Sequence, residues 1–157
     1  MDFKDFTLGV NYWPINKAMY WWQDFSPQEV EIDFARLKEF NIKYIRIFLN
    51  WEDFQPMPDR ISPEMLNHLE NVADIAAKYG LKLMPTFFCG HMSGANWMPS
   101  WMLASPSLID DVSRFPIYSG GRVRTGQIKN FYKLEELLDA QILQITKVCQ
   151  KLKGHQA

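Results

Sequence analysis

The sequence predicts an α/β fold: a partial (β/α)8 TIM barrel, made of the first three βα units with a long loop after the third strand. Three observations predict it. Nearly continuous apolar segments alternate with amphipathic ones, the predicted strands start near residues 7, 44 and 81, and a helical pattern follows each of them. Such alternation is typical of a parallel sheet that helices cover. A whole barrel needs about 250 residues, so we expect residues 1–157 to form a single N-terminal fragment of such a domain.

The first βα unit is predicted from an apolar strand and a capped helix. Phe6–Pro14 is a short apolar run that a proline ends. In the segment that follows, Ser26 suits the N-cap position, Pro27 the first helical turn and Glu29 the third position of a capping box. The apolar residues Val30, Phe34 and Leu37 then fall on one helical stripe.

The second and third units repeat this pattern. Lys43–Trp51 and Leu81–Phe88 are predicted to be buried strands, and Ser62 and Pro63 again indicate the start of a helix. The apolar side of that second helix comprises Leu66, Leu69, Val72, Ala73 and Ala76. A third helix is predicted from about residue 133 to residue 154. Its expected apolar side comprises Leu134, Leu138, Ile142, Ile145, Cys149 and Leu152.

The connection between Cys89 and about Asn130 is very long for a globular domain, and such loops are usually functional or disordered. Its segment "SLIDDVSRFPIY" could supply a fourth strand to a complete small α/β domain with an unrelated activity. The proline and the paired aspartates argue against that alternative. No glycine-rich phosphate loop follows the first strand, which argues against a doubly wound nucleotide-binding sheet.

Composition excludes several classes of partner. The net charge is −1 and 22% of residues are charged, so we expect neither nucleic acid nor a membrane as partner. No apolar run approaches the roughly 18–20 residues of a membrane span, and acids stand where a signal peptide would be basic. Cys89 and Cys149 match no metal-ligand spacing. We therefore expect a cytoplasmic protein with reduced thiols, no metal and no cofactor.

Aromatic and polar side chains gather where the predicted strands end. Aromatic residues make up 15% of the chain, and six are tryptophans. Carboxyl-terminal strand ends form the active-site face of a barrel, and sugars present apolar ring faces to aromatics and hydroxyls to polar groups. The residues expected on that face are Asn11, Tyr12, Trp13, Arg46, Asn50, Trp51, Glu52, Asp53, Phe88, His91, Ser93, Asn96, Trp97 and Trp101.

Four motifs carry a resemblance to a known family: "GVNYWP", "IRIFLNWEDFQP", "PTFFCGHMSGANWMPSW" and "KNFY…AQ…LKGH". Together they resemble the N-terminal part of the cellulase/β-mannanase-type glycoside hydrolases, which are retaining (β/α)8 enzymes that hydrolyse O-glycosidic bonds in β-linked polysaccharides. The resemblance implies that Arg46 orients the nucleophilic carboxylate, which explains a cation inside an apolar strand. It also implies that the sugar contacts are Asn11, Trp13, Trp51, His91 and Trp97. From the residues alone, Arg46 could equally pair with a structural acid.

The same resemblance places both catalytic glutamates on strands four and seven, beyond residue 157. A retaining mechanism needs two carboxyl groups about 5–5.5 Å apart, so we expect the chain to be inactive alone. Glu52 and Asp53 are adjacent and are expected to have loop or capping roles. The expected partners are an oligo- or polysaccharide and either a second copy or the missing C-terminal part. The alternative is a non-catalytic carbohydrate-binding or self-associating partial barrel.

Overall fold

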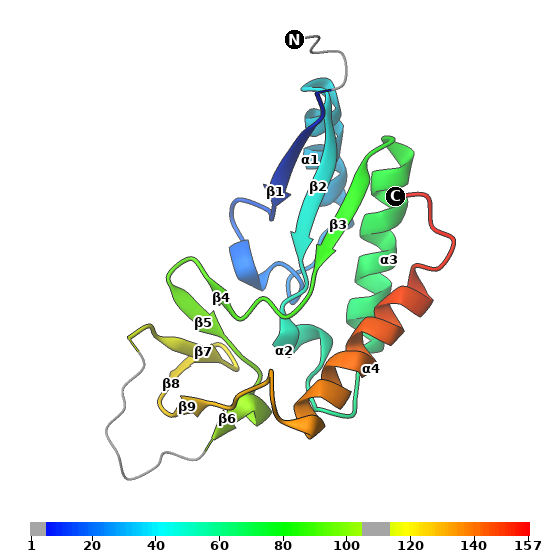
Figure 1. The fold of residues 1–157 in the computed structure, drawn as a ribbon. Helices are drawn as coiled ribbons and strands as arrows, with labels where there is room; N and C mark the ends of the chain where they lie inside the picture. Colours follow the sequence, from blue (N-terminus) through cyan, green and yellow to red (C-terminus); the bar gives the residue numbers. More distant parts are fainter. Residues whose placement is uncertain (1–5, 105–113) are drawn as a thin grey trace. The chain divides into compact units, whose positions relative to one another are not determined.

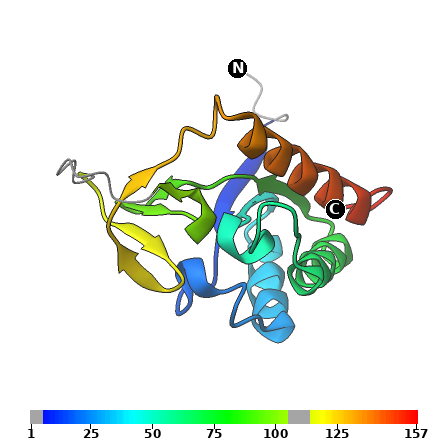
Figure 2. The same cartoon turned by 90° about the horizontal axis from the view of Figure 1, so that it is seen from below.

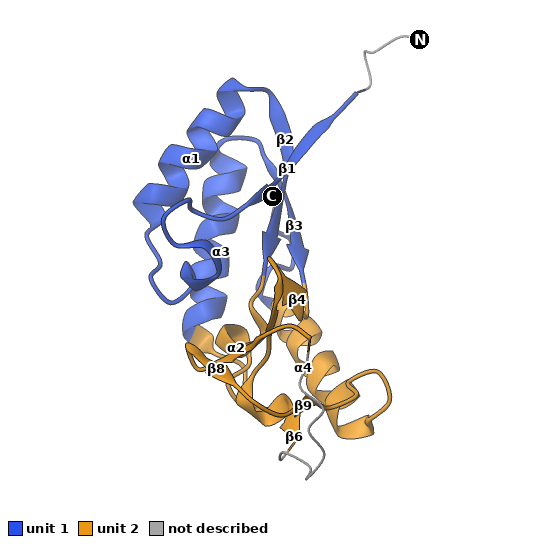
Figure 3. Cartoon of the chain, turned by 90° about the vertical axis from the view of Figure 1, so that its left-hand side faces the viewer, with its two compact units in different colours: residues 1–48, 64–86, 151–157 blue, residues 49–63, 87–150 orange. Residues whose placement is uncertain are grey.

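The computed structural model describes residues 6–104 and 114–157, which belong to two compact units. Unit 1 comprises residues 1–48, 64–86 and 151–157, and unit 2 comprises residues 49–63 and 87–150 (Figure 3). Residues 107–113 of the candidate fourth strand lie outside the described residues. Each unit is built from segments that are distant in sequence, so each is described by itself.

A parallel three-stranded sheet forms the centre of unit 1 (Figure 1). Its strands are β1 (Leu8–Tyr12), β2 (Ile42–Phe48) and β3 (Lys82–Thr86), in the order β1-β2-β3. Asn11, Arg46 and Met84 are register partners across the three strands. The parallel sheet that the alternating pattern predicts is therefore confirmed.

Two helices, α1 (Pro27–Glu39) and α3 (Pro63–Lys78), lie on the same side of this sheet (Figures 1 and 3). Helix α1 begins as its sequence predicts, because the Ser26 side chain accepts a hydrogen bond from the backbone N–H of Glu29 at 3.3 Å. The Glu29 carboxylate lies 2.9 Å from the Lys17 ammonium, in an ion pair. A short 3₁₀ turn, η2 (Ala18–Tyr20), precedes the helix.

The two faces of the sheet differ sharply in burial. Ile45 and Ile47 of β2 are fully buried, as are Val30 and Phe34 of α1. Successive side chains of a strand point to opposite faces of the sheet. The residues that alternate with the buried ones therefore point away from the helices, and of these Tyr44 is 43% exposed and Met84 is 52% exposed. Unit 1 therefore carries an uncovered sheet face that includes Asn11 and Arg46.

Unit 2 contains short strands within the segment expected to be a long loop. The strands β4 (His91–Met92), β5 (Ala95–Trp97), β7 (Ile117–Ser119) and β8 (Arg122–Arg124) form one sheet. Strands β6 (Leu103–Ala104) and β9 (Gln127–Ile128) pair separately, and a 3₁₀ turn, η3 (Ser100–Met102), lies between β5 and β6. Figures 1 and 2 show β7 and β8 as an antiparallel hairpin, drawn in yellow. No described strand of this segment joins β1-β2-β3.

The end of the second predicted strand differs from the expectation. Strand β2 ends at Phe48, and Trp51–Phe54 forms a short helix, α2. Glu52 and Asp53 therefore lie in a helical turn and do not alternate across a strand. Asn50 occupies the N-cap position, and its side-chain amide donates to the Asp53 carboxylate at 3.0 Å.

The last helix, α4 (Glu135–Lys151), buries a different stripe from the one expected. Its buried residues are Leu137, Ala140, Gln144 and Val148. Of the six residues predicted to form the packed side, Leu152 is half-buried, and the other five are exposed: Leu134, Leu138, Ile142, Ile145 and Cys149. That prediction was wrong. Both stripes recur at helical spacing, so the spacing alone does not show which of them is buried. The buried stripe is the one that includes Leu137, which packs in a core cluster with Trp51, Met98, Met102 and Ile117.

Three further observations concern the cysteines, the metal-ligating side chains and the lengths of the helices. Cys89 and Cys149 both lie in the described part of the chain, and neither forms a disulfide. In the described part of the chain, no group of three or more metal-ligating side chains comes together. Across residues 6–104 and 114–157, no helix combines the length and apolarity that a membrane crossing requires.

Candidate functional site

Asn11 and Arg46 lie side by side on the uncovered face of the unit 1 sheet. They are register partners on β1 and β2. A hollow of about 280 Å³ opens between the strands here, and its lining residues are Gly9, Val10, Asn11, Tyr44, Arg46 and Met84. The hollow combines an amide, a guanidinium and apolar surface, which are the groups that a small polar ligand requires.

The Arg46 side chain is held at two points. Its Nε–H donates to the Thr86 hydroxyl at 2.7 Å, and its guanidinium carbon lies 4.9 Å from the centre of the Phe48 ring. In residues 6–104 and 114–157, no ion pair involves Arg46. The structural acid considered as an alternative partner is therefore not found there. The guanidinium fork remains available to bind a carboxylate in a fixed orientation.

Trp13 and Phe48 extend this cluster. The Trp13 ring is half-buried, and its centre lies 5.5 Å from that of Phe48. Thr86 and Phe48 are the two site residues that sequence reasoning missed in unit 1. Both occupy the last position of a parallel strand, and that position is the signal that could have identified them.

Tyr12, at the end of β1, has a structural role. Its hydroxyl donates to the Asp33 carboxylate at 3.0 Å. Burial and the neighbouring Asp33 carboxylate raise the pKa of Tyr12 far above its ordinary value. The phenol therefore stays protonated and ties β1 to α1, and it cannot serve as a base.

In unit 2, His91 and Trp97 have well-defined but separate surroundings. His91 Nδ1 lies 2.9 Å from the Asn96 side-chain oxygen, and its ring packs 4.6 Å from that of Phe115. Trp97 stacks on Tyr118 with ring centres 4.9 Å apart and planes 17° apart. Because Asn96 and Trp97 are consecutive in β5, they point to opposite faces of the strand. His91 and Trp97 therefore do not share one wall, and Tyr118 is an aromatic partner that the sequence pattern did not indicate.

Trp51 lies in the core of unit 2. It is fully buried, and its indole N–H donates to the Gln55 side-chain oxygen at 2.8 Å. The rings of Phe88, Trp101 and Phe131 surround it at 4.6–5.6 Å. The ring is thus packed inside unit 2, and the stacking role that the resemblance implies for Trp51 stays a prediction.

Glu52 has the structural role expected of it. Its carboxylate accepts hydrogen bonds from the backbone N–H of Gly120, at 2.7 Å, and from the Ser119 hydroxyl, at 3.1 Å. The turn between β7 and β8 places Gly120 at φ +60°, a conformation that glycine adopts readily. Glu52 thus anchors this hairpin to α2.

The predicted residues fall into two groups, Asn11, Trp13 and Arg46 in unit 1 and Trp51, His91 and Trp97 in unit 2. The structure brings Asn11 and Arg46 together directly. A common rim that joins both groups stays a prediction.

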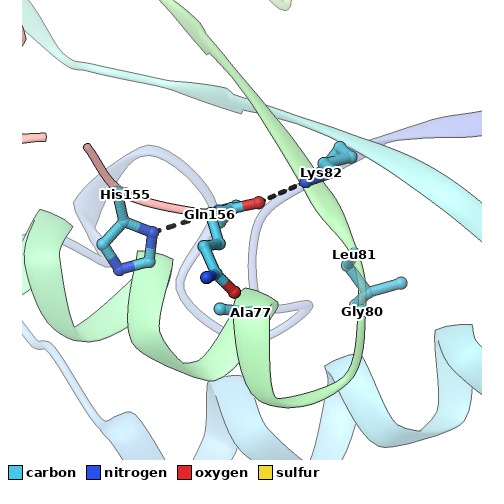
Figure 4. A pocket seen from close by; sticks show the side chains of 7 residues that line it. Ala77, Gly80, Leu81, Lys82, His155 and Gln156 are labelled. Carbon is cyan, nitrogen blue, oxygen red and sulfur yellow. Dashed lines mark hydrogen bonds between the residues drawn. The ribbon is translucent and has the colours of Figure 1, made fainter. Parts of the chain in front are cut away.

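A second hollow in unit 1, of about 400 Å³, lies at the start of β3 (Figure 4). Its ionisable groups are already used: His155 Nε2 lies 3.0 Å from Asp74, and the Lys82 ammonium donates to the Gln156 carbonyl. Parallel-sheet sites lie at carboxyl-terminal strand ends, and this hollow is at the opposite end of β3 from Thr86. We therefore place the candidate site around Arg46.

Comparison with known proteins supports the fold. No family model matches the sequence, and no curated protein matches it. Among solved structures, GH5_18 from Streptomyces cattleya, in complex with GlcNAc, is 22% identical with a TM-score of 0.76, over 94% of this chain and 30% of that chain. The exo-β-1,4-mannosidase Op5Man5 from Opitutaceae bacterium strain TAV5 is 24% identical with a TM-score of 0.73, over 94% and 22%. GH5_18 from Bifidobacterium longum subsp. infantis is 20% identical with a TM-score of 0.76, over 95% and 30%.

These structures are glycoside hydrolases of the GH5 clan of (β/α)8 barrels. The chain spans less than a third of their length, between 22% and 30% in the three comparisons. The parallel β1-β2-β3 sheet with its helices is thus a partial barrel, as the sequence predicts. This chain has the fold of part of a GH5-type glycoside hydrolase.

Proposed function

We propose that the chain is part of a retaining β-glycosidase and supplies the arginine that orients its nucleophile. The observation that supports this proposal is the combination of a fixed orientation and an unpaired charge at Arg46, as far as the structure describes the chain. Its Nε–H is held by Thr86 at 2.7 Å, and its guanidinium lies on an uncovered sheet face without an ion pair in the described residues. A carboxylate from another strand would accept two parallel hydrogen bonds from such a fork.

The sugar contacts in this proposal are Asn11 and Trp13 in unit 1 and His91 and Trp97 in unit 2. Asn11 adjoins Arg46 in the hollow, and the indole N–H of Trp97 is fixed by a 3.1 Å hydrogen bond to the Met92 carbonyl. Trp51 is left out because its ring is buried. The substrate class we propose is a β-linked mannoside, because the similar structures include an exo-β-1,4-mannosidase and a complex with Manβ1-4GlcNAc.

The chain alone is proposed not to hydrolyse glycosides. Retaining hydrolysis requires an acid/base carboxyl and a nucleophilic carboxylate about 5–5.5 Å apart. The two carboxylates next to the end of β2 already have partners: Glu52 binds Gly120 and Ser119, and Asp53 accepts from Asn50. The proposal therefore assigns both catalytic groups to residues outside this chain.

Two assays test the proposal. Reducing-sugar release from mannan and from aryl β-mannosides by the pure chain should not exceed the buffer blank. Titration with Manβ1-4GlcNAc, followed by tryptophan fluorescence, should show binding of about 1 mM or weaker, as expected of a partial site. The Trp97→Ala variant should weaken it, and Tyr132→Ala, which removes an exposed aromatic ring of unit 2 outside the proposed contacts, is the control. Turnover by the chain, or binding that Trp97→Ala leaves unchanged, would contradict the proposal.

A second candidate function is a self-associating, non-catalytic carbohydrate-binding module. The observation that favours it is the open sheet: β1 and β3 have no further strand partner in the described chain, and Tyr44 and Met84 are exposed. Unpaired strand edges and apolar faces favour association. Sugar binding by a chain that is also oligomeric would support this alternative.

A further inference from the structure

The Arg46 guanidinium has one donor that is already used and one edge that is open. Its Nε–H donates to the Thr86 hydroxyl at 2.7 Å. Across residues 6–104 and 114–157, this is the one hydrogen bond of the Arg46 side chain, and no ion pair involves it. Within that part of the chain, the N–H groups of the two terminal nitrogens are therefore open to a ligand.

The contacts of Arg46 show which way its side chain runs. Phe48 follows Arg46 by two residues on β2, so both side chains lie on one face of the sheet. Thr86 is the register partner of Phe48 on β3. The Arg46 side chain thus extends along its strand, over the Phe48 ring at 4.9 Å, and ends beside Thr86. The guanidinium therefore lies at the carboxyl-terminal end of the parallel strands, where ligands of such sheets bind.

A guanidinium has two edges that can form a pair of parallel hydrogen bonds with a carboxylate. The side-on edge uses Nε–H together with an N–H of one terminal nitrogen. The end-on edge uses one N–H from each terminal nitrogen. Because the Thr86 hydroxyl occupies Nε–H, it removes the side-on edge and leaves the end-on edge.

We propose that Arg46 binds one side-chain carboxylate end-on, and that Thr86 is the positioning residue that imposes this geometry. The inference deepens the proposed function and rests on it for the source of the carboxylate, which is the nucleophile from outside this chain. End-on binding places the carboxylate on the side of the guanidinium opposite to Nε, away from Thr86. Arg46 lines the hollow of about 280 Å³ together with Asn11, so the carboxylate would be bound at this hollow.

Hydrogen exchange at the Arg46 Nε–H measures which edge a carboxylate uses. The probe is propionate, which reproduces a glutamate side chain, and chloride at the same ionic strength controls for screening. In nuclear magnetic resonance spectra of the full chain, propionate should shift the signals of the terminal nitrogens of Arg46. The exchange rate of its Nε–H should stay unchanged, because Thr86 already holds that proton. Arg36, exposed on α1, is the internal reference.

Two substitutions of Thr86 make the test specific to its hydroxyl. Thr86→Val keeps the shape of the side chain and removes the acceptor, so Nε–H should exchange about two to ten times faster. Propionate should slow this exchange in Thr86→Val, because the side-on edge is then open. Thr86→Ser keeps the hydroxyl and should behave as the wild type does. Circular dichroism should show that both variants fold.

A second probe distinguishes a side-chain carboxylate from an acidic sugar. Glucuronate carries the same charged group on a sugar ring. A site for a glutamate side chain should bind glucuronate no more tightly than propionate. Tighter binding of glucuronate would overturn the proposal, because it would assign the hollow to an acidic substrate.

Three further results would each overturn the proposal. They are a response of Arg46 to propionate no larger than that of Arg36, a slowing of Nε–H exchange by propionate in the wild type, and a Thr86→Ser variant that behaves like Thr86→Val. None of these measurements uses a neutral sugar. The proposed function can therefore fail in the Manβ1-4GlcNAc titration while the carboxylate response remains, and the carboxylate response can fail while sugar binding remains.

Discussion

Two buried glutamines of unit 2 should respond in opposite directions to the same substitution. Gln55 and Gln144 are both fully buried. The Gln55 side chain accepts from the Trp51 indole at 2.8 Å and donates to the Pro58 and Ala140 carbonyls at 2.8 and 2.9 Å. Among the residues that the structure describes, neither polar atom of the Gln144 side chain has a hydrogen-bond partner. Methionine has a similar shape and no amide, so it isolates the hydrogen-bonding contribution at each site.

The expected magnitudes follow from that difference. Gln55→Met leaves the buried Trp51 N–H without an acceptor and weakens the bonding of two carbonyls. An orphaned buried group costs about 1–3 kcal/mol, so we expect a loss of about 3 kcal/mol. For a chain of this size that lowers the Tm by roughly 6–12 °C. Gln144→Met removes an amide that is already unsatisfied, and we expect a gain of about 1 kcal/mol.

Urea unfolding of the two variants, followed by circular dichroism, measures both values. The m-value should stay unchanged, because the surface exposed on unfolding is the same. Equal destabilisation by both substitutions would refute the reasoning, since it would mean that Gln144 has a partner as important as those of Gln55.

Three further changes test other contacts. Glu52→Gln removes the charge that strengthens two bonds from the β7–β8 turn, and thermal melting should show a loss of about 1 kcal/mol; an unchanged Tm would contradict the anchoring role. The Lys78 ammonium lowers the pKa of Glu31 below its ordinary value, so this contribution is present above pH 4.5 and is lost as the pH falls through the lowered pKa. The Tm difference between wild type and Glu31→Gln should therefore vanish at low pH, and a constant difference would count against the pair. Thr86→Val removes the bond to Arg46 Nε and should lower stability by about 0.5–1.5 kcal/mol, with a larger loss pointing to a packing role for Thr86.

The helix starts could be predicted because their signals are local. Ser26 and Pro27 stand next to each other in the sequence, and the cap they form needs only the first turn of α1. The parallel sheet could be predicted for a related reason. Its strands are long apolar runs, and helices separate them at regular intervals.

The misassigned elements depend on contacts between distant segments. Trp51 was expected at a strand end, but partners more than thirty residues away, such as Phe88 and Trp101, bury it. On α4, the more apolar stripe is the exposed one, and only the position of the core cluster decides which side packs. The strands β4–β9 contain two or three residues each, which is too short for a period-2 pattern to be recognised.

The candidate site was predictable in part for the same reasons. Arg46 and Asn11 lie on strands, so their register followed once the parallel order was known. Tyr118 became a partner of Trp97 through a parallel β5–β7 pairing across twenty residues. No local signal in the sequence indicates that pairing.

The most direct measurement is a nuclear magnetic resonance titration of the chain with Manβ1-4GlcNAc. It would follow the Asn11 side-chain amide and the Arg46 Nε–H, with the exposed Asn41 amide as control. The account predicts that the two site signals shift together and saturate with one common Kd, while Asn41 does not respond. Site signals that stay unmoved at saturating sugar, or that shift no more than Asn41, would contradict the assignment of this face to a glycosidase.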